Sequence, residues 1–133
     1  MNEVIEALKE AAITQTIPLD LPDEDDLVEI EEQLLLPIPA ALKTFLLNVS
    51  DLVCGSIEPV TVCDPHAHTH LPEVTAEAWA QGLPRDLMPI CQTNHCYYCI
   101  NQEGNILSWQ HGEFGDEQWE DIWEWAEDVW IKS

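Results

Sequence analysis

The sequence predicts an α+β fold: a single domain, residues 1–133, with a central, mainly antiparallel sheet flanked by N-terminal helices and a C-terminal Trp-rich helix. Three observations predict it. A chain of 133 residues is the size of one domain. Apolar residues recur at helical spacing near both ends of the chain. Between these regions lie short strand-like runs joined by a turn, and separate groups of helices and strands are typical of α+β proteins.

Three helices are expected in the first part of the chain. Apolar spacing predicts the first over residues 2–13. The second is expected to open at Pro22–Asp26, because proline fits a first turn and carboxylates there oppose the positive end of the helix dipole. Its buried stripe is predicted to be Leu27, Ile30 and Leu34, with Leu35 as a candidate fourth member. Two prolines follow, so the third helix is expected at Ala40–Asn48.

Strands are expected beyond Gly55. The first is predicted at Ile57–Val62, and a short helix at Val74–Gln81 is expected to end at Gly82. Three further strand-like runs are Leu87–Cys91, Cys96–Asn101 and Ile106–Gln110. Gly104 and Asn105 tolerate the positive φ that a hairpin turn requires, so the last two runs are expected to pair antiparallel.

The last helix is expected to begin near Trp119, with Asp116 as its candidate N-cap. At about 100° per residue, one face collects Trp119, Ile122, Trp123, Ala126, Val129 and Trp130. The opposite face collects Glu117, Glu120, Asp121, Glu124, Glu127 and Asp128. Trp125 falls on the border between the faces, where a half-exposed aromatic is expected. A stripe of this kind is typical of a helix that packs on a sheet.

The charge narrows the classes of partner. The chain has 26 Asp and Glu against 4 Lys and Arg, a net charge of −22. Nucleic acids and anionic membranes bind proteins mainly through Lys and Arg, so neither is an expected partner, whereas a negative field favours a basic protein. Sixteen of the carboxylates fall in residues 20–32 and 113–128. From these blocks the candidate partner-binding residues are Asp23, Glu24, Asp25, Asp26, Asp116, Glu117, Glu120, Asp121, Glu124 and Trp125.

The N-terminal residues and the cysteines indicate a compartment. Met1–Ala12 contains three glutamates and lacks the features of a signal peptide, and no segment has the length of a membrane span, so a cytoplasmic location is expected. An odd number of cysteines fits reduced thiols better than a disulfide framework. They are Cys54, Cys63, Cys91, Cys96 and Cys99, and no disulfide is expected among them.

One histidine cluster offers an alternative chemistry. His66, His68 and His70 would lie on one face of an extended segment, and three neutral imidazoles can hold zinc. A metal-binding protein or small metal-dependent hydrolase therefore remains the alternative function. Cys96 and Cys99 form a lone Cys-x-x-Cys, which favours buried thiols over a metal site. No nucleophile elbow or phosphate-binding loop occurs, so the main expectation is a non-enzyme without a cofactor.

Several short motifs, in order, resemble those of the SUKH superfamily of Smi/Knr-like domains. The first half contributes Ile30-Glu31, Ile38-Pro39, Leu42-Lys43 and Phe45-Leu46-Leu47. The second half contributes Leu87-Met88-Pro89-Ile90, Tyr97-Tyr98-Cys99-Ile100-Asn101, Gly104-Asn105-Ile106, Trp109 and the closing Trp119–Trp130 segment. The resemblance spans about residues 20–131 and departs at Ser50-Asp51, where the family has Asn-Gly-Gly.

The resemblance implies an α+β domain that is usually not an enzyme. Bacterial members are immunity proteins that bind and neutralise a cognate toxin, often a nuclease, and fungal relatives are interaction hubs in cell-wall signalling. The main hypothesis is therefore an immunity protein whose acidic surface neutralises a basic toxin. The acidic composition agrees with it, because a nuclease active site is cationic and an acidic protein can occupy it.

Overall fold

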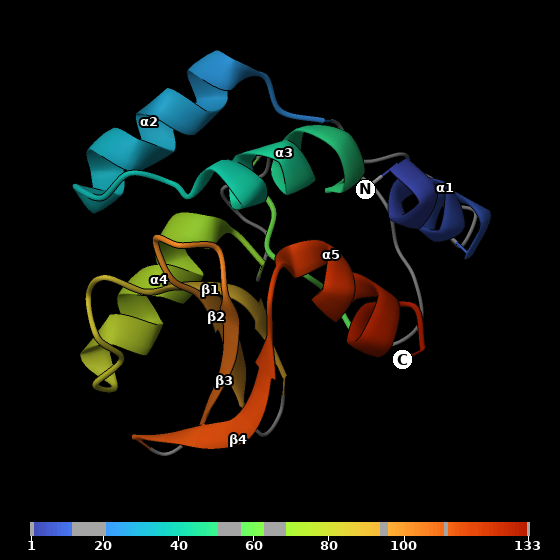
Figure 1. The fold of residues 1–133 in the computed structure, drawn as a ribbon. Helices are drawn as coiled ribbons and strands as arrows, with labels where there is room; N and C mark the ends of the chain where they lie inside the picture. The colour runs from blue at the N-terminus through green and yellow to red at the C-terminus, as the bar shows by residue number, and fades with distance from the viewer. Residues whose placement is uncertain are drawn as a thin grey trace.

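Helices enclose an antiparallel sheet, which confirms the predicted α+β class (Figure 1). A computed structural model describes residues 2–11, 21–50, 57–62, 69–93, 96–110 and 112–132. Its helices before the sheet are α1 (Asn2–Ala11), α2 (Glu24–Leu34), α3 (Ala40–Val49) and α4 (Leu71–Ala80). The strands are β1 (Met88–Gln92), β2 (Tyr97–Ile100), β3 (Ile106–Gln110) and β4 (Glu113–Trp119). The chain closes with α5 (Ile122–Trp125), which continues as the π-helical turn η1 (Ala126–Trp130).

The sheet is a meander in which each strand pairs with the next along the chain. Its order is β1-β2-β3-β4, and all three pairings are antiparallel. Gly104 and Gly112 adopt positive φ angles of 94° and 82° in the two turns that flank β3, a conformation that favours glycine. The predicted hairpin between β2 and β3 is confirmed, because Ile100 lies opposite Ile106.

Aromatic side chains join the helices to one another and to the sheet. On α3, the ring of Phe45 lies 5.8 Å from that of Trp123 and 5.5 Å from that of Trp130. On β2, the Tyr98 ring meets Trp119 at 5.7 Å and Trp125 at 5.5 Å. In Figure 1, α4 and α5 lie to either side of the sheet, and α3 crosses above it. The C-terminal tryptophans thus connect α3 and β2 within a core that also includes residues of α2, α4 and β1.

The element predicted as one C-terminal helix is instead a strand followed by a shorter helix. Residues 113–119 form β4, and the N-cap of α5 is Asp121, whose carboxylate accepts from the Glu124 N–H at 2.8 Å, rather than Asp116. Gly112 reverses the chain, so that Glu113 lies opposite Gln110 and the outer edge of β3 gains a partner. Gly115 approaches Ser108 so closely that a Cβ there would overlap the serine hydroxyl. The sequence pattern does not predict β4, because Trp119 is buried as the last residue of that strand and yet fits the apolar spacing of the helix that follows.

Smaller differences concern where elements begin. Pro22 precedes α2 rather than opening it, and Asp23 is the N-cap. α4 begins at Leu71, three residues earlier than predicted, with Pro72 in its first turn. The strand predicted at Ile57–Val62 is wrong: its named pairings are isolated bridges, from Pro59 to Cys91 and from Thr61 to His70. Proline lacks the N–H that a continuous ladder needs. Residues 12 and 13 of the first predicted helix lie outside the described part of the chain.

Candidate functional site

The first acidic surface lies at the start of α2. Asp23 and Asp26 form a capping box there: the Asp23 carboxylate accepts from the Asp26 N–H at 2.9 Å, and the Asp26 carboxylate accepts from the Asp23 N–H at 3.0 Å. Both carboxylates therefore stabilise the helix. Glu24 and Asp25 are exposed, and neither side chain bonds to another described residue. They are the carboxylates of this surface that are available to a partner.

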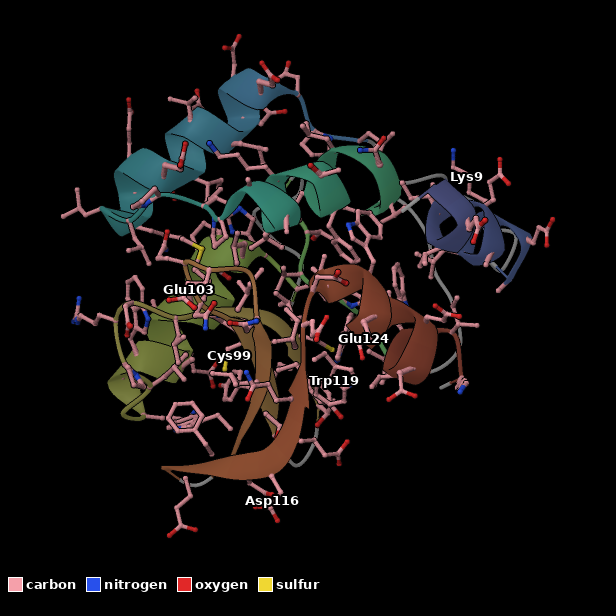
Figure 2. The ribbon with its side chains drawn as sticks, in the orientation of Figure 1. Lys9, Cys99, Glu103, Asp116, Trp119 and Glu124 are labelled. Atoms are coloured by element: carbon pink, nitrogen blue, oxygen red, sulfur yellow. The ribbon has the colours of Figure 1, made fainter. Side chains whose placement is uncertain are left out.

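The second acidic surface extends from β4 into the start of α5. Asp116 and Glu117 are exposed on the strand, and Asp116 points away from the fold in Figure 2. Glu120 follows in the turn. At the start of α5, the Glu124 carboxylate accepts from the Glu120 N–H at 3.1 Å, while Asp121 caps the helix. The predicted residues thus belong to two elements, not to one helix face.

The two acidic surfaces lie far apart. Figure 1 places α2 at one end of the view and β4 at the other, with α3 and most of the sheet between them. A partner must therefore reach across the domain to contact both surfaces at once. The separation also means that each surface can be tested by its own substitutions.

Little basic charge offsets these surfaces. Lys43 lies 3.4 Å from the Glu31 carboxylate and Lys132 lies 3.8 Å from that of Asp128. Arg85 lies over the Trp79 ring, 5.2 Å from its centroid. Lys9 lies on the exposed side of α1, away from α2 and β4 (Figure 2). The carboxylates of Glu24, Asp25, Asp116 and Glu117 form no ion pair with any described residue.

Trp125 is not a half-exposed partner anchor. Its exposed fraction is 0%, and its ring packs on Tyr98. The predicted face is buried at Ile122 and Trp123, and Trp125 at its border is buried as well, because the Tyr98 ring on β2 covers it. The indole Nε1 has no hydrogen-bond partner among the described residues. Trp125 therefore belongs to the core.

A groove between α2 and α3 adjoins the first acidic surface. It encloses about 410 Å³. Its lining combines apolar side chains with charged ones: Glu24, Leu27, Val28, Glu31, Ala40, Lys43, Thr44 and Leu47. Val28 is 49% exposed at this site, although sequence patterning does not single it out. No periodic signal identifies it, because Leu21 and Leu35, seven residues to either side, lie outside α2.

Leu35 does not join the buried stripe of α2. Leu27, Ile30 and Leu34 are buried as predicted, whereas Leu35 is 90% exposed. It ends the helix in the left-handed conformation, with φ 55° and ψ 34°, which turns the chain out of the helical path. The helical pattern of buried residues therefore ends at Leu34, one residue before Leu35.

Only one member of the histidine cluster lies in the described part of the chain. His70 is buried at the N-cap of α4, and its Nδ1 has no hydrogen-bond partner among the described residues. His66 and His68 fall outside the described residues. Within residues that the structure describes, no group of three or more His, Cys, Asp or Glu side chains could hold a metal.

Three cysteines are described, and each is a free thiol. Burial raises the pKa of Cys91 and of Cys99 to about 12. Thiols with such values are protonated at neutral pH and are poor nucleophiles. These two thiols therefore do not suit nucleophilic catalysis. Cys54 and Cys63 lie outside the described residues.

Comparisons with known proteins agree with this fold. No described helix combines the length and apolar character that a membrane span requires. No curated protein matches the chain. A solved crystal structure of a protein from Pseudomonas syringae pv. tomato is 56% identical, covers 100% of both chains and has a TM-score of 0.96. The family model described as SUKH_5, SMI1-KNR4 cell-wall, matches residues 1–131. The chain therefore belongs to the SUKH superfamily, within the SMI1-KNR4 family.

Proposed function

We propose that this protein is a non-catalytic binding module that acts in the cytoplasm as an immunity protein against a basic toxin. Family membership supports a SUKH-type binding domain. The observation that carries the proposal is the pair of acidic surfaces on α2 and on β4–α5, where Glu24, Asp25, Asp116 and Glu117 are exposed and form no ion pair with any described residue. Unneutralised like charges cost stability, so a partner that uses the field explains their presence.

The toxin that fits best is a nuclease. Such an enzyme binds phosphates through a cationic site, and carboxylates arranged on a folded surface occupy that site by charge complementarity. Steering by charge acts before contact, so it changes the association rate more than the dissociation rate. The acidic surfaces therefore serve fast capture of the toxin.

The experiment uses the product of the reading frame next to this gene as the partner. Association and dissociation rates are measured at several salt concentrations. The association rate is expected to fall by tenfold or more as salt screens the two surfaces, on the order expected for steered complexes. An association rate that does not change with salt contradicts the proposal.

Substitutions in each surface measure its own contribution to the association rate. Asp116→Asn, Glu117→Gln and Glu120→Gln are combined with Asp121→Asn and Glu124→Gln, because the amides at 121 and 124 keep an oxygen that can accept the capping hydrogen bonds. The matched variant changes Glu24 and Asp25 to Gln and Asn. Slower association in either variant, with an unchanged unfolding midpoint, supports steering. If both variants protect against the toxin as well as the unmodified protein does, the acidic surfaces are not needed and the proposed steering is excluded.

A further inference from the structure

The exposed apolar residues are concentrated beside α2. Among the described residues, the large apolar side chains with high exposure are Leu21 at 46%, Val28 at 49%, Leu35 at 90% and Phe114 at 49%. Three of these four are separated by seven residues. Of these three, only Val28 lies within α2: Leu35 is the C-cap that follows the helix, and Leu21 precedes the N-cap Asp23. These three residues are called the α2 stripe.

The α2 stripe is distinct from the face that α2 buries. Leu27, Ile30 and Leu34 are buried and anchor the helix to the fold. They lie about 100° or more around the helix from Val28, at about 100° per residue. Figure 1 shows α2 at the periphery, with α3 and α4 on its inner side and none of the described elements on its outer side. Val28 also lines the groove shared with α3.

The conformation of Leu35 indicates a use outside folding. A left-handed conformation at the end of a helix is normally taken by glycine, because a Cβ there is strained. Leu35 bears that strain while its side chain is 90% exposed, so burial within this chain does not compensate for it. Strain of this kind is typical of residues retained for a functional contact.

Carboxylates flank the α2 stripe on both sides. At about 100° per residue, Glu24 and Glu31 lie to one side of Val28, and Asp25 and Glu32 lie to the other. Glu31 is paired with Lys43, but the other three carboxylates are exposed and unpaired among the described residues. An exposed apolar side chain between two charged rows of a helix is an arrangement through which one helix recognises another.

We infer that the α2 stripe is the docking site for a basic amphipathic helix of the partner, with an apolar row that covers Val28 and Leu35 and Lys or Arg on both flanks. A second copy of this chain would place carboxylates against carboxylates, which disfavours self-pairing. The inference rests on the proposed function and identifies the kind of segment that the toxin presents.

The test uses a designed helix as the probe. The peptide has three heptads with Leu at the a and d positions and Lys at e and g, and it carries a fluorophore for anisotropy measurements. A scrambled peptide of equal composition carries the same charge without the apolar row. The protein variants are Val28→Gln and Leu35→Gln, and Phe114→Gln is the matched control because Phe114 and Val28 are both 49% exposed. All three substitutions leave the net charge unchanged.

Val28→Gln and Leu35→Gln are each expected to weaken binding of the helical peptide about tenfold, and Phe114→Gln is expected to change it less than about twofold. Equal binding of the scrambled peptide, or equal loss in all three variants, overturns the inference. Sedimentation that shows a dimer dissolved by Val28→Gln also overturns it, since the occupant is then a second copy. If the cognate toxin binds these variants as tightly as the unmodified protein, the docking site is refuted while the proposed function stands.

Discussion

The carboxylate of Glu31 fixes the turn between α2 and α3. It accepts a hydrogen bond from the Ile38 N–H at 2.8 Å and lies 3.4 Å from the Lys43 ammonium. One side chain on α2 thus holds both the turn that follows it and the next helix. This relationship gives a physical role to the Ile30-Glu31, Ile38-Pro39 and Leu42-Lys43 motifs.

Substitutions at Glu31 are expected to separate the hydrogen bond from the ion pair. Glu31→Ala leaves the Ile38 N–H without its acceptor and should lower the free energy of unfolding by about 1–3 kcal/mol. Glu31→Gln keeps an oxygen acceptor, and Lys43→Met removes only a partly exposed ion pair, so each should cost less than about 1 kcal/mol. Urea unfolding of the three variants measures the order. Equal losses in all three would show that the ion pair, and not the hydrogen bond, dominates.

Leu35→Gly is expected to stabilise the protein, although it removes a large side chain. Glycine relieves the left-handed strain, which is about 1–2 kcal/mol, and part of this gain is offset by the greater freedom of the unfolded chain. The free energy of unfolding should therefore rise by about 0.5–1 kcal/mol. The control is Val28→Gly, within the helix, which should lower it by a similar amount or more. A loss of stability in Leu35→Gly would show that its side chain supports the fold.

The sequence predicts elements well where one face packs on the core. α3 ends one residue beyond its predicted end, and β3 has its predicted bounds. In both elements, the pattern of apolar residues within the element determines where it begins and ends. Periodicity fails at 116–119, where the predicted start of the last helix is instead the end of β4. Trp119 continues an apparent helical stripe, but the pairing of β4 with β3 comes from a partner that local spacing does not contain.

In the candidate site too, the sequence predicts features that depend on composition alone and misses those that depend on the fold. Charge composition locates both acidic blocks, because it needs no knowledge of the fold. The sequence does not reveal that Asp23, Asp26 and Asp121 accept capping hydrogen bonds, since this depends on where each helix begins. It also places Trp125 at the half-exposed border of the last helix and offers Leu35 as a candidate member of a buried stripe, whereas the structure buries Trp125 and exposes Leu35. Leu35 is exposed because α2 ends at Leu34, whereas Trp125 is buried because the Tyr98 ring on β2 covers it.

Replacement of Trp125 is expected to damage folding. Its side chain is buried and packs on Tyr98, so Trp125→Ala should lower the free energy of unfolding by about 3–5 kcal/mol. Phe114→Ala, at a half-exposed aromatic, should change it by about 0.5 kcal/mol or less. Chemical denaturation followed by circular dichroism measures both. A Trp125→Ala variant with unchanged stability would contradict the packing of α5 on the sheet.

The buried thiols predict a stability that decreases in alkali. The pKa of both Cys91 and Cys99 is raised by burial from 9.0 to about 12. Between these values the unfolded chain loses thiol protons that the folded chain retains, so the free energy of unfolding falls as the pH rises. Below about pH 9 this contribution is fully present. Unfolding midpoints measured from pH 8 upward should decline less steeply in a Cys91→Ala, Cys99→Ala variant than in the unmodified protein.

Thiol reactivity offers an independent measurement of the same two groups. In a background with Cys54→Ser and Cys63→Ser, the remaining thiols are Cys91, Cys96 and Cys99. Cys96 is partly exposed and the other two are buried, so a disulfide reagent at pH 8 should modify Cys96 first. Cys91 and Cys99 should react only at the rate of unfolding, because at pH 8 about one thiol in ten thousand with a pKa near 12 is ionised. Three thiols that react at one common rate in the folded protein would show that the strands around them open far more readily than their burial implies.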